Sequence, residues 1–143
     1  MISMIIGIFT VNAIKNTKLY HLINENTISE NESFYKFLGT GIIKKLFINT
    51  PLKNFNTQIV INKSKLNITA LNDLKMKMTD AEIGHIVAFV VIIATSGFLY
   101  ILNQNGFVIV VLNGLNITFN LYPILIQQQN KLKIDKMIKS YII

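Results

Sequence analysis

The sequence contains no cysteine and no arginine, and these two absences exclude several kinds of chemistry. Without cysteine the chain has no disulfide, no thiolate nucleophile and no cysteine-based zinc site. Without arginine it lacks the planar fork that reads phosphates and guanines with two hydrogen bonds, and its 14 basic residues are all lysines. The lysines form no basic run with interleaved aromatics. We therefore expect no nucleic acid among its partners.

Charged residues are also scarce, at 15% of 143 residues, whereas 51% of the residues are hydrophobic. This balance is too apolar for an ordinary soluble domain of this length and is typical of a membrane protein. The length suits one domain, and no change in composition divides the chain. We predict a single all-α integral membrane domain over residues 1–143, with membrane lipids as its partners.

Two apolar runs are long enough to cross a bilayer: residues 83–102 (IGHIVAFVVIIATSGFLYIL) and residues 107–126 (FVIVVLNGLNITFNLYPILI). About 20 apolar residues match a hydrocarbon core of roughly 30 Å. Only the uncharged turn NQNG separates the two runs, so they should form antiparallel neighbours. We predict a transmembrane helical hairpin within residues 79–130.

The lysines lie on both flanks of this hairpin, and none lies in the turn or in the two runs. The positive-inside rule therefore places both flanks in the cytoplasm, in a multi-pass protein of the cell membrane, with residues 131–143 as a basic tail. Residues 1–14 (MISMIIGIFTVNAI) are either a short first membrane segment or the remainder of a longer one. They lack the basic start and the cleavage site of a signal peptide.

Residues 15–78 are predicted to form a cytoplasmic, partly membrane-associated region. Within it, apolar residues recur at helical spacing over residues 31–49 (NESFYKFLGTGIIKKLFIN), and the lysines lie mostly off that face. Two interpretations stay open: an interfacial amphipathic helix interrupted near Gly39 and Gly41, or an ordinary helix packed on the protein itself. The stretch QIVI at residues 58–61 resembles a strand, but no partner strand is evident, so we expect a helix or loop.

Polar residues crowd the entrance of the first run. Thr79 to Glu82 (TDAE) fits a capping box, and the carboxylates of Asp80 and Glu82 suit the positive end of a helix dipole. Capping does not account for His85, which follows Glu82 by three residues on the same face, where a carboxylate could hold the imidazole. A Glu-x-x-His pair is also half of a di-iron ligand set, but the second pair is missing, so no metal is expected.

Amides form a stripe on one face of the second run, at Asn113, Asn116, Asn120 and Gln127. Unpaired amides facing lipid would be costly, so this face should turn toward the first run. Counting back from the turn places His85 between Asn120 and Gln127, and Glu82 near Gln127 and Gln128. The stripe either provides hydrogen bonds between the helices or belongs to a functional site, because an ionisable residue inside a span is a functional candidate.

Three stretches taken together resemble the glycosyl-4,4'-diaponeurosporenoate acyltransferase family: FYKFLGTGIIKKLF (34–47), TDAEIGHIVAF (79–89) and NITFNLYPILIQQQNKLKI (116–134). The residues that match the family's pattern are Glu82, His85, Asn116, Asn120, Pro123, Gln127 and Asn130. The family's tail carries arginines and a tyrosine, where this chain has Gln128, Gln129, Lys131 and Lys133. The resemblance implies a membrane enzyme that attaches a fatty acyl chain to a carotenoid sugar.

The first functional hypothesis is therefore an O-acyltransferase that moves a fatty acyl group onto a hydroxyl of a lipid-linked substrate, such as a carotenoid glycoside. It needs no cofactor, because a thioester donor as co-substrate already carries a good leaving group. His85 would take the hydroxyl proton, Glu82 would orient His85, and Asn120 or Gln127 would donate to the oxyanion. The residues expected to bind substrate are Asn116, Asn120, Gln127, Asn130, Lys131 and Lys133, and Lys136 would join the two lysines in attracting the donor's phosphates.

The second hypothesis is a non-catalytic small membrane protein that acts as a partner or assembly factor. In that case the amide stripe only joins the two helices. A His85→Gln substitution would then have no effect on cellular lipids, whereas replacing Asn116 or Asn120 by leucine would disturb packing.

Overall fold

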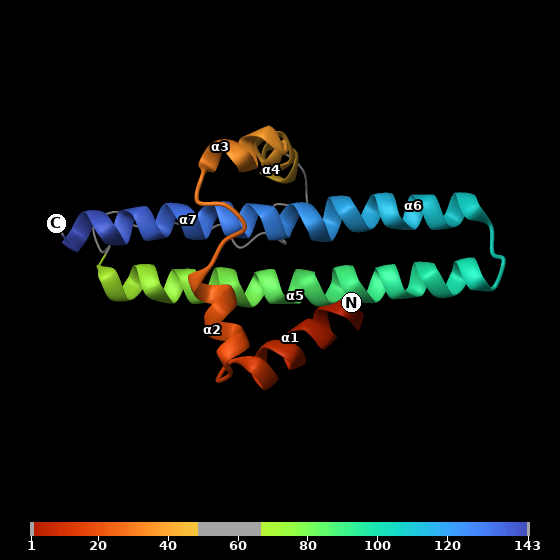
Figure 1. The fold of residues 1–143 in the computed structure, drawn as a ribbon, viewed down its shortest axis with the longest axis horizontal. Coiled ribbons are helices and arrows are strands. Elements are labelled where there is room, and N and C mark those ends of the chain that lie inside the picture. The colour runs from red at the N-terminus through yellow and green to blue at the C-terminus, as the bar shows by residue number, and fades with distance from the viewer. Residues whose placement is uncertain (1, 49–66, 143) are drawn as a thin grey trace.

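The computed structural model describes residues 2–48 and 67–142, and these residues form helices joined by short connections (Figure 1). The all-α prediction is thereby confirmed for the described residues. The stretch at 58–61 lies outside them.

Two long helical segments lie side by side and run in opposite directions (Figure 1). The first is α5 (Ile68–Ile101), and the second comprises α6 (Gly106–Asn116), the π-helical turn η3 (Ile117–Leu121) and α7 (Tyr122–Ile142). The tight turn between them uses a positive φ of 52° at Asn103, which asparagine tolerates better than most residues. The predicted run 107–126 lies within the second segment, and the run 83–102 lies within α5 except for its last residue, the C-cap Leu102.

The start of α5 differs from the prediction. Its N-cap is Asn67, whose side-chain oxygen accepts a hydrogen bond from the backbone N–H of Ala70 at 2.7 Å. The capping box predicted at Thr79 is therefore wrong. The helix passes straight through that position because Leu71, Leu74 and Met78 recur at helical spacing and pack on α7, so the added turns are stabilised by burial.

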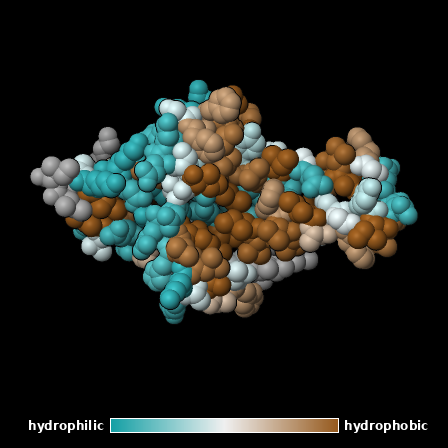
Figure 2. All heavy atoms as spheres, in the orientation of Figure 1, coloured by the Kyte–Doolittle hydropathy of each residue, from teal (hydrophilic) through white to brown (hydrophobic). Residues whose placement is uncertain are grey.

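Both long segments are apolar enough to cross a membrane. In their most apolar windows only 17% and 28% of the residues are buried, whereas a core helix of a soluble protein would bury most of its apolar residues. Figure 2 shows hydrophilic residues gathered over the end where α5 begins and α7 ends, and hydrophobic residues over the middle. The exposed apolar surface is thus the part that would face lipid.

Two short helices cover one side of α5 (Figure 1). α1 (Ile2–Ile14) crosses α5 where two glycines meet: a Cβ added to Gly7 would lie 2.9 Å from the Gly84 Cα. α1 has 13 residues, or roughly 20 Å of helix, which is less than the hydrocarbon core. α2 (Lys18–Glu25) buries Tyr20, whose hydroxyl donates to Asp80 Oδ1 at 2.7 Å. Burial and this hydrogen bond raise the pKa of Tyr20.

The amphipathic stretch forms α3 (Glu32–Phe37) and α4 (Thr40–Ile48), which lie against α7 (Figure 1). The chain breaks at Gly39, where φ is +79°, so the predicted interruption near Gly39 is confirmed, while Gly41 lies inside α4. Tyr35 and Thr40 are buried. The most exposed apolar side chains point the other way, with exposed fractions of 88%, 69% and 56% at Phe37, Ile42 and Leu46. The pair therefore packs on the protein and also presents an apolar surface.

Candidate functional site

A chain of hydrogen bonds links the two long helices near their midpoint. Asn116 and Asn120 are buried on the second segment, with His85 half-buried on α5 opposite them. The Asn116 side chain reaches across to the backbone oxygen of Phe89. The predicted proximity of His85 and Asn120 is confirmed by a contact of 3.3 Å between His85 Nδ1 and Asn120 Oδ1.

This chain determines which nitrogen of His85 carries the proton. Asn116 Nδ2 donates to the carbonyl oxygen of Phe89 at 3.1 Å, and a carbonyl can only accept. Asn116 Oδ1 therefore accepts from Asn120 Nδ2, at 2.8 Å. Asn120 is left with its oxygen toward His85, so a neutral His85 must donate from Nδ1. Its lone pair then lies on Nε2, which is the arrangement that a general base requires.

The π-helical turn holds both asparagines on the inner face. It runs from residue 117 to residue 121, and Asn120 lies within it. Pro123 follows almost directly and supplies the physical reason: it has no N–H to donate to the carbonyl four residues earlier, and its ring crowds that carbonyl. A widened turn relieves the conflict. Pro123, which matched the family pattern, therefore shapes the backbone around Asn120.

Glu82 forms a buried ion pair with Lys131 one turn away from His85. The two side chains are 2% and 0% exposed, and Lys131 Nζ lies 2.7 Å from Glu82 Oε2, a close charge contact rather than an aligned hydrogen bond. Gln128 Nε2 donates to the other carboxylate oxygen at 2.8 Å. The expected position of Glu82 near Gln128 is thus confirmed. The described contacts of Glu82 are with Gln128 and Lys131, and the imidazole of His85 contacts Asn120. A role for Glu82 in orienting His85 stays a prediction.

Lys131 also contacts the C-terminal end of α2. Its ammonium donates to the backbone oxygens of Ile23 and Asn26 and lies against the Glu82 carboxylate, so three oxygen atoms surround it. A buried ion pair is tolerated when hydrogen bonds of this kind compensate the loss of water. This arrangement anchors the end of α2 to both long helices, and it leaves Lys131 with no surface toward a ligand.

The remaining predicted residues are spread over α7 and α6. Asn130 Oδ1 accepts from Lys44 on α4 at 3.4 Å, Lys133 is exposed, and Gln127 is half-buried. Asn113 donates to the backbone of its own helix, at Ile109. The structure therefore joins Asn116 and Asn120 to His85, and it places Asn130 and Lys133 further along α7.

Sequence reasoning placed Gln128 near Glu82, but it missed the contacts that Gln128 and Gln129 make with the segment that contains α3 and α4. Gln128 Oε1 accepts from the Tyr35 hydroxyl at 3.3 Å and from the backbone N–H of Ile28 at 3.1 Å. Gln129 accepts from Thr40 at 3.2 Å. The signal was present in the run QQQN, because consecutive amides at the end of an apolar span cannot all face one helix. Two of these amides accept hydrogen bonds from side chains of α3 and α4.

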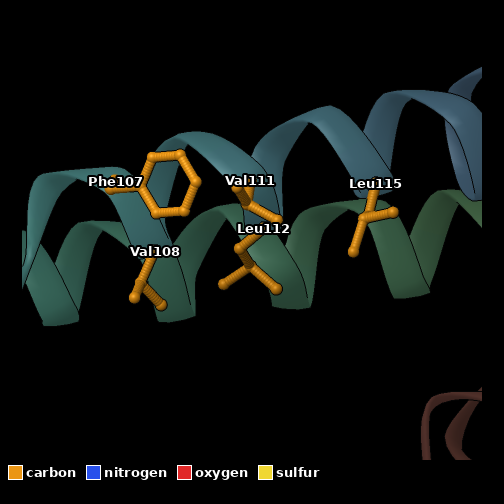
Figure 3. A pocket seen from close by; sticks show the side chains of 5 residues that line it. All are labelled: Phe107, Val108, Val111, Leu112 and Leu115. Carbon is orange, nitrogen blue, oxygen red and sulfur yellow. The ribbon is translucent and has the colours of Figure 1, made fainter.

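A shallow apolar groove runs along α6 on the turn side of this site (Figure 3). It is lined by Phe107, Val108, Val111, Leu112 and Leu115. The groove extends from the hairpin turn as far as Leu115, one residue before Asn116 in the chain. Its lining is suited to a hydrocarbon chain.

The comparisons with known proteins agree with the resemblance noted in the sequence. No curated protein and no solved structure matches the chain significantly. A model of one protein family, described as glycosyl-4,4'-diaponeurosporenoate acyltransferase, matches residues 16–140. This match includes the buried ion pair, the His85 cluster and the lysines of α7. The chain therefore belongs to the glycosyl-4,4'-diaponeurosporenoate acyltransferase family.

Proposed function

We propose that the protein is a membrane O-acyltransferase that moves a fatty acyl group onto a hydroxyl of a lipid or glycolipid, with a carotenoid glycoside as the acceptor that the family suggests. One observation carries this proposal beyond family membership. The hydrogen-bond chain from Phe89 through Asn116 and Asn120 leaves the lone pair of His85 on Nε2. A base with a fixed tautomer, within an otherwise apolar span, is more than helix packing requires.

In the proposed reaction His85 Nε2 removes the proton of the acceptor hydroxyl as its oxygen attacks the carbonyl carbon of a thioester donor. A carbon–oxygen bond forms, the carbon–sulfur bond breaks, and His85 returns the proton to the departing thiolate. Ester and thiol are the products, so atoms and charge balance without a cofactor. Asn120 steadies the imidazolium that forms transiently, since its oxygen already faces the Nδ1–H.

Asn120 is a less favourable oxyanion donor, because one of its two Nδ2 protons is already donated to Asn116. Gln127 is the best candidate. Its side chain has no hydrogen-bond partner among the residues that the structure describes, and it lies half-buried on α7. In this proposal the acyl chain lies along the groove of α6, and the positive-inside rule puts the reacting end of the hairpin at the cytoplasmic side.

The experiment that tests this function uses a strain in which the gene is deleted and then restored with variants, followed by mass spectrometry of the extracted lipids. We expect His85→Gln to lower the acylated product by about 10²-fold or more, because general-base catalysis contributes typically 10²–10⁴-fold. His21→Gln is the matched control, since His21 is the other histidine and is exposed on α2. An acylated lipid that persists unchanged in His85→Gln would remove the mechanism.

The non-catalytic alternative is favoured by a different observation, namely that the buried amides all have partners within the protein. A partner or assembly factor would need these contacts only for packing. It predicts an unchanged lipid profile in His85→Gln together with lost protein in Asn116→Leu. The same lipid extracts, compared with the amount of protein on an immunoblot, separate the two functions.

A further inference from the structure

Carboxylates are few in this protein, and the structure gives most of them lysine partners away from α4. All seven acidic residues lie in the described ranges. Four form ion pairs, namely Lys15–Asp80, Lys75–Asp135, Lys131–Glu82 and Lys136–Glu32. Of the three tail lysines expected to attract phosphates, Lys131 is buried and Lys136 is bonded to Glu32. Lys133 is left as the lysine available to a ligand.

A second lysine lies beside it. Lys44 on α4 donates to Asn130 Oδ1 at 3.4 Å, and Asn130 and Lys133 are three residues apart on α7, which places them on the same helix face. Partial burial lowers the pKa of Lys44, and repulsion by the positive charge of Lys133 lowers it further. Two ammonium groups that lie near each other repel, and a bound anion would offset this repulsion.

Glu32 neutralises this region only in part. It is bonded to Lys136 at 2.7 Å, and its pKa is lowered first by that hydrogen bond, with smaller contributions from the charges of Lys133 and Lys36. One carboxylate is thus shared by several lysines. The face between α4 and α7 therefore keeps an excess of positive charge.

We propose that Lys44, Lys133 and Asn130 form a binding site for a phosphate-bearing anion. The two ammonium groups supply charge and only donate hydrogen bonds, which suits phosphate oxygens. Asn130 accepts from Lys44 through its oxygen, so its Nδ2 remains as a hydrogen-bond donor for the ligand. The same two helices, α3 and α4, expose Phe37, Ile42 and Leu46 on the face turned away from α7. A helix pair with both an apolar and a basic face fits the headgroup level of a membrane.

Two sources supply this chemistry: the headgroup of an anionic lipid, or the diphosphate of a soluble acyl carrier. The test uses purified protein in nanodiscs of phosphatidylcholine, with and without inorganic pyrophosphate, and in nanodiscs that also contain phosphatidylglycerol. Reductive methylation followed by mass spectrometry reports how fast each lysine reacts. We expect Lys44 and Lys133 to be protected by the anion, and the exposed Lys18 and Lys139 to react as before.

Protection by pyrophosphate identifies a soluble phosphate ligand, and protection confined to phosphatidylglycerol identifies a lipid headgroup; either result supports the site. Lys44→Gln and Lys133→Gln should each weaken binding of the protective anion about tenfold, the loss of one charge-assisted hydrogen bond. Lys139→Gln makes the same charge change on the same helix and should bind normally. Lys44→Arg keeps the positive charge and should still bind the anion, which would show that the loss in Lys44→Gln does not come from misfolding.

Equal protection of all exposed lysines, protection of none, or unchanged binding in Lys44→Gln would overturn the proposal. The proposal does not depend on catalysis by His85. His85→Gln should bind the anion like the unaltered protein, so a failed anion site and a failed acyltransferase mechanism give different results.

Discussion

At the scale of single residues, two polar groups in the interior serve different purposes. The Glu82–Lys131 pair is closed, since the two charges face each other and their other contacts come from Gln128 of α7 and the end of α2. The His85 chain is open, since one imidazole nitrogen is held by Asn120 while the other keeps its lone pair. The first arrangement is that of an anchor and the second that of a reactive group.

The anchor leads to a stability prediction. Lys131→Met should destabilise the fold by about 3–5 kcal/mol, because it leaves the Glu82 carboxylate buried without its cation. Adding Glu82→Gln should recover most of the loss, since a neutral amide needs no counter-charge. The free energy of unfolding in mixed micelles, followed by helical circular dichroism, measures both. A double variant as unstable as Lys131→Met would contradict this account.

The tautomer of His85 can be observed directly. With ¹⁵N-labelled histidine, solid-state NMR in a bilayer should show one histidine protonated on Nδ1 and bare on Nε2. Replacing Asn120 by leucine removes the acceptor, so the ring should change to a mixture of tautomers while the helices persist. The His21→Gln variant assigns the signals. An Nε2-protonated His85 in the unaltered protein would refute the deduced chain of hydrogen bonds.

At the scale of elements, features set by periodicity could be predicted from the sequence, whereas features set by distant contacts mostly could not. Counting residues from the turn predicted that His85 lies near Asn120 and that Glu82 lies near Gln128, because a tight turn fixes the register of two antiparallel helices. The pattern TDAE predicted a helix start that Leu71, Leu74 and Met78 override by packing on α7. Burial of Lys131 could not be predicted, because it depends on backbone oxygens at the end of α2, more than a hundred residues earlier.

The crossing of α1 over α5 depends on the absence of a side chain at one position. Gly7→Ala would place a Cβ 2.9 Å from the Gly84 Cα, and backbone cannot move aside as a flexible side chain does. We expect a loss of about 1–3 kcal/mol, the usual range for overpacking. Gly114→Ala is the control: nothing lies within 4 Å of its added Cβ, so it should be neutral or stabilising by roughly 1 kcal/mol. Unfolding in mixed micelles measures both variants, and equal stabilities would contradict the close crossing.

At the scale of the whole molecule, the distribution of polarity suggests how the hairpin lies in a bilayer. The start of α5 and the end of α7 carry the charged residues and lie together at one end of the molecule. The uncharged turn between α5 and α6 forms the other end (Figure 2). The His85 cluster lies between them, one turn on the apolar side of the Glu82–Lys131 pair. A lipid-borne hydroxyl and a phosphate-bearing donor could thus meet at the boundary between the two regions.

This arrangement requires the turn and the lysine-rich end to lie on opposite sides of the membrane. Cysteines introduced at Asn105 and Lys139, both exposed, provide the test, and the native chain adds no thiol background because it has no cysteine. In intact cells an impermeant maleimide should label Asn105→Cys alone, because lysine-rich flanks stay in the cytoplasm. Lys139→Cys should react only after the membrane is opened. Labelling of both positions in intact cells, or of neither, would mean that the hairpin does not cross as proposed, and His85 would then lose its place at the cytoplasmic boundary.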